Sequence, residues 1–306
     1  MSWKVENYLS EKAFVDKTES AMTKVKPFLS EELPNLVIFP EDLGTPLILA
    51  ACRVRPGEFK SFASVASGLI RRNIVNVSLL RLQKGIGHVR ALYLLKARDI
   101  ARMYFGAMKH MASRFRVHLI GGSLLLPDFE SYDRLEPVGR NVYNVSFIFA
   151  PSGEIIHKQR KVHLVDLEGK KGLDVESSDL QEMSIMDLGF ARIGLAICYD
   201  AFFTDVVGKL ASQGAEVLVQ PSANPALWTP EEEEKWETGI LSKVQDYDQL
   251  QYGINPMMVG MMFDIPFEGR SSIVGKRLEG SQGGGYIKRA NSWNEEEILV
   301  ADLIPR

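Results

Sequence analysis

The feature that most constrains the fold is a strand, a helix and a second strand that follow one another along the chain. The apolar run at 191–197 is typical of a strand, a helical pattern then extends to about Ser212, and a second apolar run occupies Glu216–Val219. The whole unit takes about 30 residues, the length of a crossover between parallel neighbours in one sheet. The pattern therefore predicts an α/β fold.

The same alternation continues through the rest of the 306 residues. Apolar spacing predicts helices at 10–32, 89–115 and 230–250. Apolar runs predict strands at 36–39, 116–120, 142–149, 257–263, 271–274 and 298–303, with Gly121-Gly122 ending the second of them. The sequence has no linker, repeat or shift in composition, so we expect a single domain spanning residues 1–306.

Composition narrows the possible partners. The chain has 36 basic and 39 acidic side chains and a net charge of −3, which disfavours nucleic acid as a partner. No apolar run approaches the roughly 20 residues of a membrane span, so no membrane partner is expected. Residues 1–6 lack a signal-peptide core, which predicts a cytoplasmic location. The glycines at 283–285 lack a following Lys-Ser/Thr and indicate a turn, not a phosphate loop.

The chain contains two cysteines, Cys52 and Cys198. Neither lies near a second Cys or a His at metal-ligand spacing, so we expect no disulfide, no metal and no cofactor. Cys52 follows the apolar run 47–51 and is interpreted as core. Cys198 lies where a strand gives way to a helix, which would expose its thiol beside free N–H groups and make it easier to ionise. Cys198 is therefore a candidate nucleophile.

A cysteine nucleophile needs a base, and the histidines form no recognisable papain-like arrangement. Carboxylates and lysines stand at predicted strand exits instead. Glu41 follows a strand that ends against Pro40. Lys161 follows a second strand, and Cys198 follows a third. A Glu-Lys-Cys set is the alternative that these positions indicate.

Three short motifs carry this set: Phe39-Pro40-Glu41, residues 160–164 and Cys198-Tyr199-Asp200. In this order they resemble the catalytic motifs of the nitrilase, or carbon-nitrogen hydrolase, superfamily. Secondary motifs at 121–123, 143–144, 151–153, 220–223 and 267–272 agree, so the resemblance extends from about residue 33 to 303. It implies a four-layer α-β-β-α sandwich and a homodimer or a larger assembly of the same chain.

The resemblance also implies a role for each motif. Glu41 would be the general base that takes the thiol proton and later activates water. Lys161 would stabilise the oxyanion of the tetrahedral intermediate. Cys198 would form a thioester with the acyl part of the substrate and release ammonia or an amine.

Further residues follow from the same resemblance. Glu168 lies where the family's second glutamate orients substrate and assists proton transfer, although residues 168–172 have the composition of a flexible loop. Tyr199, through its backbone N–H, and Asn224 are expected at the oxyanion and substrate-binding positions. Tyr199-Asp200 after the cysteine is similar to the amidase and carbamoylase branches, whereas true nitrilases usually carry Trp-Glu. A small linear amide or N-carbamoyl compound is therefore the expected substrate, with nitrile hydrolysis or non-catalytic binding of a metabolite or protein as alternatives.

The chain also departs from the family pattern. Residues 1–9 offer no convincing first strand, which predicts that this strand is absent or degenerate. The segment 52–88 is longer than the usual connection and could be an added lid, a partner surface or a solvated helix. Residues 201–205 lack the family's usual arginine and Phe-Pro-Glu, which predicts an unusual substrate pocket.

Overall fold

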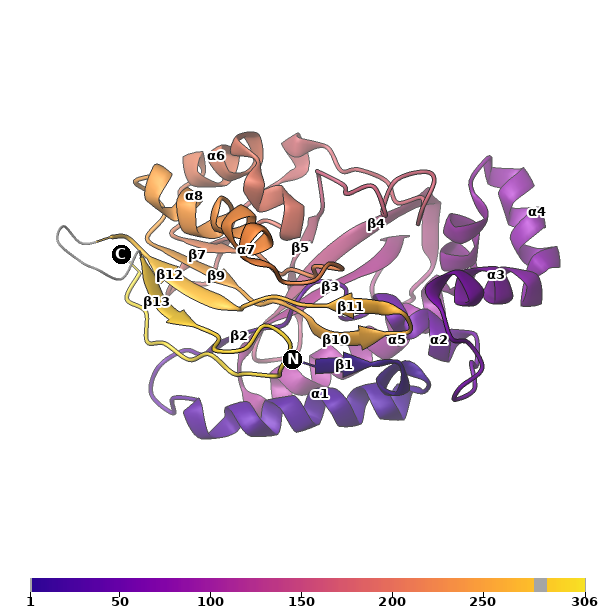
Figure 1. The fold of residues 1–306 in the computed structure, drawn as a ribbon, viewed down its shortest axis with the longest axis horizontal. Coiled ribbons are helices and arrows are strands. Elements are labelled where there is room, and N and C mark those ends of the chain that lie inside the picture. The colour runs from indigo at the N-terminus through magenta and orange to yellow at the C-terminus, as the bar shows by residue number, and fades with distance from the viewer. Residues whose placement is uncertain (1, 278–284, 306) are drawn as a thin grey trace.

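Two facing β-sheets form the centre of the fold in the computed structural model, which describes residues 2–277 and 285–305 (Figure 1). The predicted turn at 283–285 lies largely outside these residues. The four-stranded sheet contains, in spatial order, β2 (Leu36–Ile38), β3 (His118–Phe129), β4 (Pro137–Phe149) and β5 (Ile155–Arg160). The six-stranded sheet contains, in spatial order, β13 (Tyr286–Arg289), β12 (Ser272–Gly275), β9 (Tyr252–Asn255), β8 (Val217–Val219), β7 (Arg192–Leu195) and β6 (Met186–Asp187).

An apolar layer joins the two sheets. Ile120 and Ile148 from the four-stranded sheet belong to one buried cluster with Ile193, Leu195 and Val217 from the six-stranded sheet. Strands β7 and β8 pair in parallel and are connected through α6 (Thr204–Ser212), as the strand-helix-strand pattern predicts.

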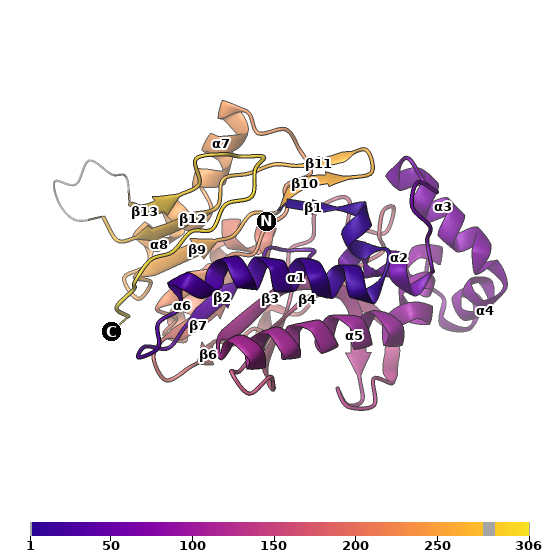
Figure 2. The same cartoon turned by 90° about the horizontal axis from the view of Figure 1, so that it is seen from below.

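Helices cover the outer face of each sheet. Helices α1 (Glu11–Val25) and α5 (His88–Phe115) lie over the four-stranded sheet, as Figure 2 shows from below. Helices α6 and α8 (Ile240–Asp246) pack on the six-stranded sheet, burying Leu210 and Val244 with Leu218. The predicted four-layer α-β-β-α sandwich is confirmed.

The N-terminal segment, where an absent or degenerate strand is expected, contains a strand of three residues. Residues Ser2–Lys4 form β1, which pairs in parallel with β10 (Val259–Met262), and β11 (Ile265–Phe267) completes this third sheet. The strand is anchored by Trp3, whose buried ring lies 5.1 Å from Tyr8 and 5.7 Å from Phe14. Aromatic packing thus stabilises a segment too short to show the alternation of a strand.

Several predicted elements differ from those in the structure. Strand β3 does not end at Gly121-Gly122 but continues through a bulge in its pairing with β4. The helix predicted at 230–250 is two helices, α7 (Pro230–Glu237) and α8, separated around Gly239, which has ψ of −125°. Residues 298–303 form no strand.

Short 3-10 helices occupy Val5–Tyr8, Lys26–Phe28, Thr45–Leu47, Leu180–Glu182 and Cys198–Phe202.

The segment 52–88 follows α2 (Ile48–Ala51) and forms α3 (Phe62–Arg72) and α4 (Ile74–Lys84), which project at one end of the molecule (Figures 1 and 2). Helix α4 buries Val77 and exposes Val75, Leu79 and Leu82. A lid or a partner surface here stays a prediction.

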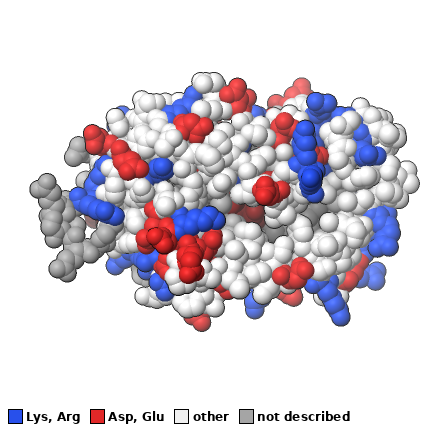
Figure 3. All heavy atoms as spheres, turned by 45° about the horizontal axis from the view of Figure 1, so that its top comes forward, with Lys and Arg blue, Asp and Glu red and all other residues white. Residues whose placement is uncertain are grey.

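Charges are interspersed over the face drawn in Figure 3, where acidic and basic side chains alternate. Across the described residues, none of the helices combines the length and apolar character that crossing a bilayer requires.

Candidate active site

Three strand ends bring the predicted catalytic side chains together. Glu41 follows β2, Lys161 follows β5, and Cys198 follows β7 on the opposite sheet. All three residues are buried, with 2%, 1% and 6% of their surface exposed. The Lys161 Nζ lies 2.7 Å from the Glu41 Oε1. The Cys198 thiol donates to the Ala223 carbonyl at 4.0 Å, and the N–H of the same Ala223 donates to the Glu41 Oε2 at 3.0 Å. The carboxylate therefore binds the cation directly and lies close enough to the thiol to act on it electrostatically.

The backbone of Cys198 is held in an uncommon conformation, with φ of +49°. Its N–H donates to the Pro221 carbonyl at 2.9 Å, and its own carbonyl accepts from the Gln220 Nε2 at 2.9 Å. These bonds tie the nucleophile to the segment that follows β8.

The acidity of Cys198 differs from the expectation of an easily ionised thiol. Burial and the adjacent Glu41 charge raise the pKa of Cys198 well above its ordinary value, although Lys161 opposes the effect. The residue begins a 3-10 helix of five residues, so no long helix dipole acts on the sulfur. The Cys198 thiol is therefore harder to ionise than a free cysteine, so a role as nucleophile requires a base that removes its proton.

Glu41 has the environment of a base. Burial and the nearby Glu168 raise the pKa of Glu41, while Lys161 lowers it. Its Oε2 accepts from the Ala223 N–H at 3.0 Å, and its Oε1 accepts from the Asn144 Nδ2 at 3.0 Å. The carboxylate is therefore oriented by two fixed donors and kept more basic than a solvated glutamate.

Lys161 lies between two carboxylates. Its Nζ is 2.7 Å from Glu41 and 2.8 Å from the Glu168 Oε2. Burial lowers the pKa of Lys161, but the neighbouring acidic groups, Glu41 first among them, outweigh burial and hold the pKa well above its ordinary value. The ammonium is thus a permanent positive charge beside the thiol.

Glu168 belongs to the site, and the loop that carries it is compact instead of loose. The Val165 N–H donates to the Glu168 Oε2 at 3.0 Å, and the Glu168 carbonyl accepts from the Val175 N–H at 2.9 Å. A Cβ at Gly172 would lie 2.0 Å from the Leu167 carbonyl oxygen, so the turn requires glycine at this position. The glycines and lysines of 168–172 mark a tight turn, not flexibility.

The bulge in β3 positions the base. Gly122 has φ of +68°, and a Cβ there would lie 2.0 Å from the Pro40 carbonyl oxygen. The next residue, Ser123, accepts the Asp42 N–H on its Oγ at 3.0 Å and the Gly44 N–H on its carbonyl at 3.0 Å. The Gly121-Gly122-Ser123 motif therefore fixes the backbone on both sides of Glu41.

Asn144 and Asp200 have roles that the sequence analysis did not assign, although both stand in motifs that it singled out. The Asn144 Nδ2 bridges the two glutamates, at 3.0 Å from Glu41 and 2.7 Å from Glu168. The buried Asp200 carboxylate accepts the backbone N–H groups of Val162 (3.1 Å) and His163 (2.7 Å), which fixes the segment just after Lys161. Their places within the motifs Tyr143-Asn144 and Cys198-Tyr199-Asp200 are the signal that could have identified them.

Tyr199 and Asn224 each have contacts of their own near the site. Tyr199 follows Cys198 and packs its half-buried ring 4.9 Å from Phe203. Asn224 is buried, and its Nδ2 donates to the Glu268 carbonyl at 3.2 Å, which ties it to the loop after β11. Roles for these two residues in binding substrate stay predictions.

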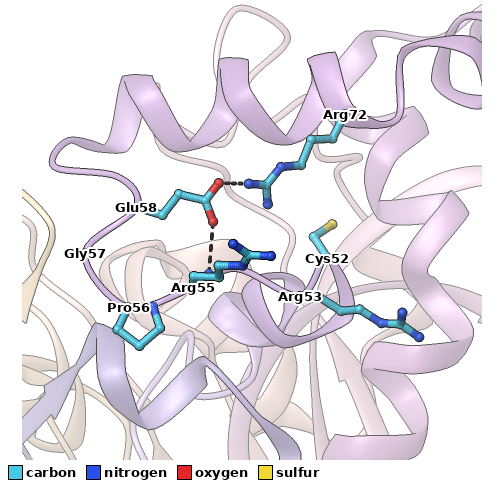
Figure 4. A pocket seen from close by; sticks show the side chains of 7 residues that line it. All are labelled: Cys52, Arg53, Arg55, Pro56, Gly57, Glu58 and Arg72. Atoms are coloured by element: carbon cyan, nitrogen blue, oxygen red, sulfur yellow. Dashed lines mark hydrogen bonds and ion pairs between the residues drawn. The ribbon is translucent and has the colours of Figure 1, made fainter.

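A separate hollow of about 610 Å³ contains none of these side chains. It lies beside α2 and α3, where Glu58 pairs with Arg72 and accepts the Arg55 N–H (Figure 4). Cys52 lines this hollow and is half-buried, so it is not the plain core residue that the sequence analysis expects. Within 2–277 and 285–305, no group of three or more His, Cys, Asp or Glu residues is arranged to hold a metal ion.

Comparison with known proteins gives a consistent result. The family model described as carbon-nitrogen hydrolase matches residues 32–305. Similar proteins include omega-amidase NIT3 of Saccharomyces cerevisiae, 30% identical over 38% of each chain, and omega-amidase NIT2 of Homo sapiens, 31% identical over 40% of this chain and 44% of the human protein. These alignments span less than half of the relatives' own lengths.

Solved structures share the fold. An amidase from Nesterenkonia sp. aligns with a TM-score of 0.58 and 16% identity over 92% of this chain and 81% of its own. Nit3 of Saccharomyces cerevisiae, a member of branch 10 of the nitrilase superfamily, aligns with a TM-score of 0.56 and 19% identity over 96% and 83%. With the family model covering nearly the whole chain, the protein belongs to the carbon-nitrogen hydrolase family of the nitrilase superfamily.

Proposed function

We propose that this protein hydrolyses the carbon-nitrogen bond of a small linear amide or N-carbamoyl compound through a thioester on Cys198. One observation carries the proposal: in a buried site the Glu41 carboxylate binds the Lys161 ammonium, and Ala223 holds both this carboxylate, through its N–H, and the Cys198 thiol, through its carbonyl. A base, a fixed cation and a nucleophile held together are the parts that acyl transfer requires. The relatives named as omega-amidases support an amide as the substrate class.

The first half of the reaction forms the thioester. Glu41 removes the thiol proton as the Cys198 sulfur attacks the carbonyl carbon, and the carbonyl oxygen becomes an oxyanion. Lys161 and the Tyr199 N–H stabilise this charge. The proton held by Glu41 passes to the leaving nitrogen, the carbon-nitrogen bond breaks, and ammonia or an amine departs.

The second half returns the free enzyme. Glu41 takes a proton from a water molecule, whose oxygen attacks the thioester carbon. The carbon-sulfur bond breaks, the sulfur regains a proton, and a carboxylic acid is released. The raised pKa of Glu41 suits both steps, since the group must accept a proton and then return it. Glu168 supports Lys161 and contacts substrate in this proposal.

Mass spectrometry of the protein mixed with small amides, N-carbamoyl compounds and nitriles tests the proposal directly. We expect an acyl adduct on the peptide containing Cys198 and release of ammonia in the amide or carbamoyl samples. Cys198→Ala should abolish both signals, whereas Cys52→Ala, the matched control, should retain them. No adduct and no ammonia from any compound would refute amide hydrolysis, and activity with nitriles alone would select the alternative. The homodimer and the cytoplasmic location stay predictions.

A further inference from the structure

Arg90 is a buried cation outside the catalytic set. It lies in the first turn of α5, and 7% of its side chain is exposed. Its Nε donates to the Asp174 carbonyl at 2.6 Å, one terminal nitrogen lies 3.0 Å from the Asp174 Oδ1, and the other lies 2.8 Å from the Glu176 Oε2. A buried guanidinium is tolerated because these oxygens satisfy its donors.

Asp174 is held from two directions. Its second carboxylate oxygen accepts the Gly87 N–H at 2.9 Å, at the start of α5. Arg90 binds its carbonyl and its other carboxylate oxygen. The residue has φ of +55°, a conformation that a non-glycine residue adopts only when its surroundings enforce it. Arg90 and the helix terminus thus fix both the backbone and the side chain of Asp174.

The bonds from Arg90 and Gly87 to Asp174, here called the Asp174 clamp, are linked to the site through one compact loop. The Asp174 N–H donates to the Gly169 carbonyl at 3.0 Å, and the Val175 N–H donates to the Glu168 carbonyl at 2.9 Å. The Glu168 side chain, at the other end of these bonds, lies 2.8 Å from the Lys161 Nζ. Two backbone hydrogen bonds therefore link the segment at Asp174 to the segment that carries the Glu168 carboxylate.

We propose that Arg90 is a positioning residue for the hydrolysis: through Asp174 it holds the loop at 165–175 so that Glu168 stays against Lys161. The inference rests on the proposed function, because it assigns Glu168 a part in the reaction. Arg90 touches neither substrate nor the reacting sulfur. Its effect reaches the chemistry only by way of the loop.

A double-mutant comparison separates this role from a merely structural one. Arg90→Met removes the clamp, Asp174→Asn weakens it while keeping the side-chain size, and Glu168→Gln removes the carboxylate that the clamp positions. The matched control is Arg102→Met, which removes another arginine of α5 from an ion pair with Glu11, at a position where the side chain is 56% exposed. Urea unfolding measures the folded fraction of each variant, and kcat/KM is compared per folded molecule.

We expect Arg90→Met and Glu168→Gln each to lower kcat/KM by about 100-fold, the scale of a displaced catalytic group. The double variant should fall no more than about threefold below Glu168→Gln, because both changes disable the same carboxylate. Asp174→Asn should lose about tenfold, and Arg102→Met should match the wild type. A double variant that loses the product of the two single effects, or Arg90→Met activity equal to that of Arg102→Met, overturns the inference.

A second measurement tests the role of Arg90 even if the proposed hydrolysis is wrong. If the wild type hydrolyses no amide, the comparison moves to the rate at which iodoacetamide labels Cys198, which needs no substrate. Release of the loop should open the buried thiol, so Arg90→Met should label at least about three times faster than Arg102→Met. Equal labelling rates of the two variants overturn the clamp whatever the substrate is.

Discussion

Replacing Asp42 by asparagine should stabilise the protein at alkaline pH. Asp42 follows Glu41 in the chain, is half-buried, and accepts a hydrogen bond from the Thr45 hydroxyl at 2.6 Å. Burial and the adjacent Glu41 charge raise the pKa of Asp42 from 3.8 to about 7. Asparagine keeps the acceptor for Thr45, tolerates the positive φ of 58°, and carries no charge.

The magnitude follows from linkage between protonation and folding. Since the pKa of Asp42 is higher in the folded chain than the 3.8 of an unperturbed carboxyl, folding takes up a proton between these values. The stability associated with the proton is complete below about pH 4 and is lost as the pH rises through about 7. The shift of about three pKa units corresponds to about 4 kcal/mol, reduced to about 2–4 kcal/mol by the partial exposure of the residue.

Urea unfolding followed by tryptophan fluorescence at pH 5 and pH 8.5 measures this effect. Asp42→Asn should exceed the wild-type midpoint modestly at pH 5, where about a third of the effect has developed, and by a clearly larger urea concentration at pH 8.5. Asp133→Asn, a change at an exposed aspartate, is the control and should follow the wild type at both values. If Asp42→Asn shows the wild-type pH dependence, or is less stable at pH 8.5, ionised Asp42 does not destabilise the fold and the reasoning is refuted.

Three further changes test the site. Gly122→Ala should lower the free energy of unfolding by at least about 2 kcal/mol and the rate of hydrolysis by about 100-fold, because the added methyl meets the Pro40 carbonyl and displaces Glu41. Thermal melting and ammonia release measure the two effects. Wild-type values in both assays would contradict this prediction. Asp200→Ala should lose about 2–5 kcal/mol by leaving two buried N–H groups unpaired, while Asp200→Asn should lose less than half of that by urea unfolding. Glu41→Gln should remove the charge that raises the pKa of Cys198, so the Cys198 thiol should react faster with iodoacetamide at pH 8 although the rate of hydrolysis falls. Labelling slower than that of the wild type would argue against this electrostatic coupling.

The layered fold could be predicted because local signals place its strands and helices. The meeting of Glu41, Lys161 and Cys198 could be predicted because each follows a strand, the first two in the four-stranded sheet and Cys198 in the six-stranded sheet that faces it. Their roles in catalysis stay predictions. The predicted order of motifs needed no knowledge of distances. The prediction that Gly121-Gly122 ends a strand was wrong, because a glycine pair looks the same in the sequence whether the strand bulges or ends there.

Contacts between distant segments were not predictable in this way. Arg90 and Asp174 are 84 positions apart, and nothing near either residue indicates the other. The loop at 168–172 was interpreted as flexible because its composition is that of a loop, whereas its compact conformation depends on hydrogen bonds within the loop and between Asp174 and Gly87 at the start of α5. The acidity of Cys198 was misjudged for a related reason: burial and the neighbouring charge of Glu41 outweigh the strand-to-helix context.

The positive φ of Cys198 has a consequence for laboratory evolution of this protein. A non-glycine residue in that conformation costs about 1–2 kcal/mol, which Cys198→Gly would recover while removing the nucleophile. Alanine would keep the strained backbone, so the two inactive variants should differ in melting temperature. A library selected only for heat resistance would therefore enrich glycine at this position and lose hydrolysis. Selection rounds for stability need an activity filter at every cycle.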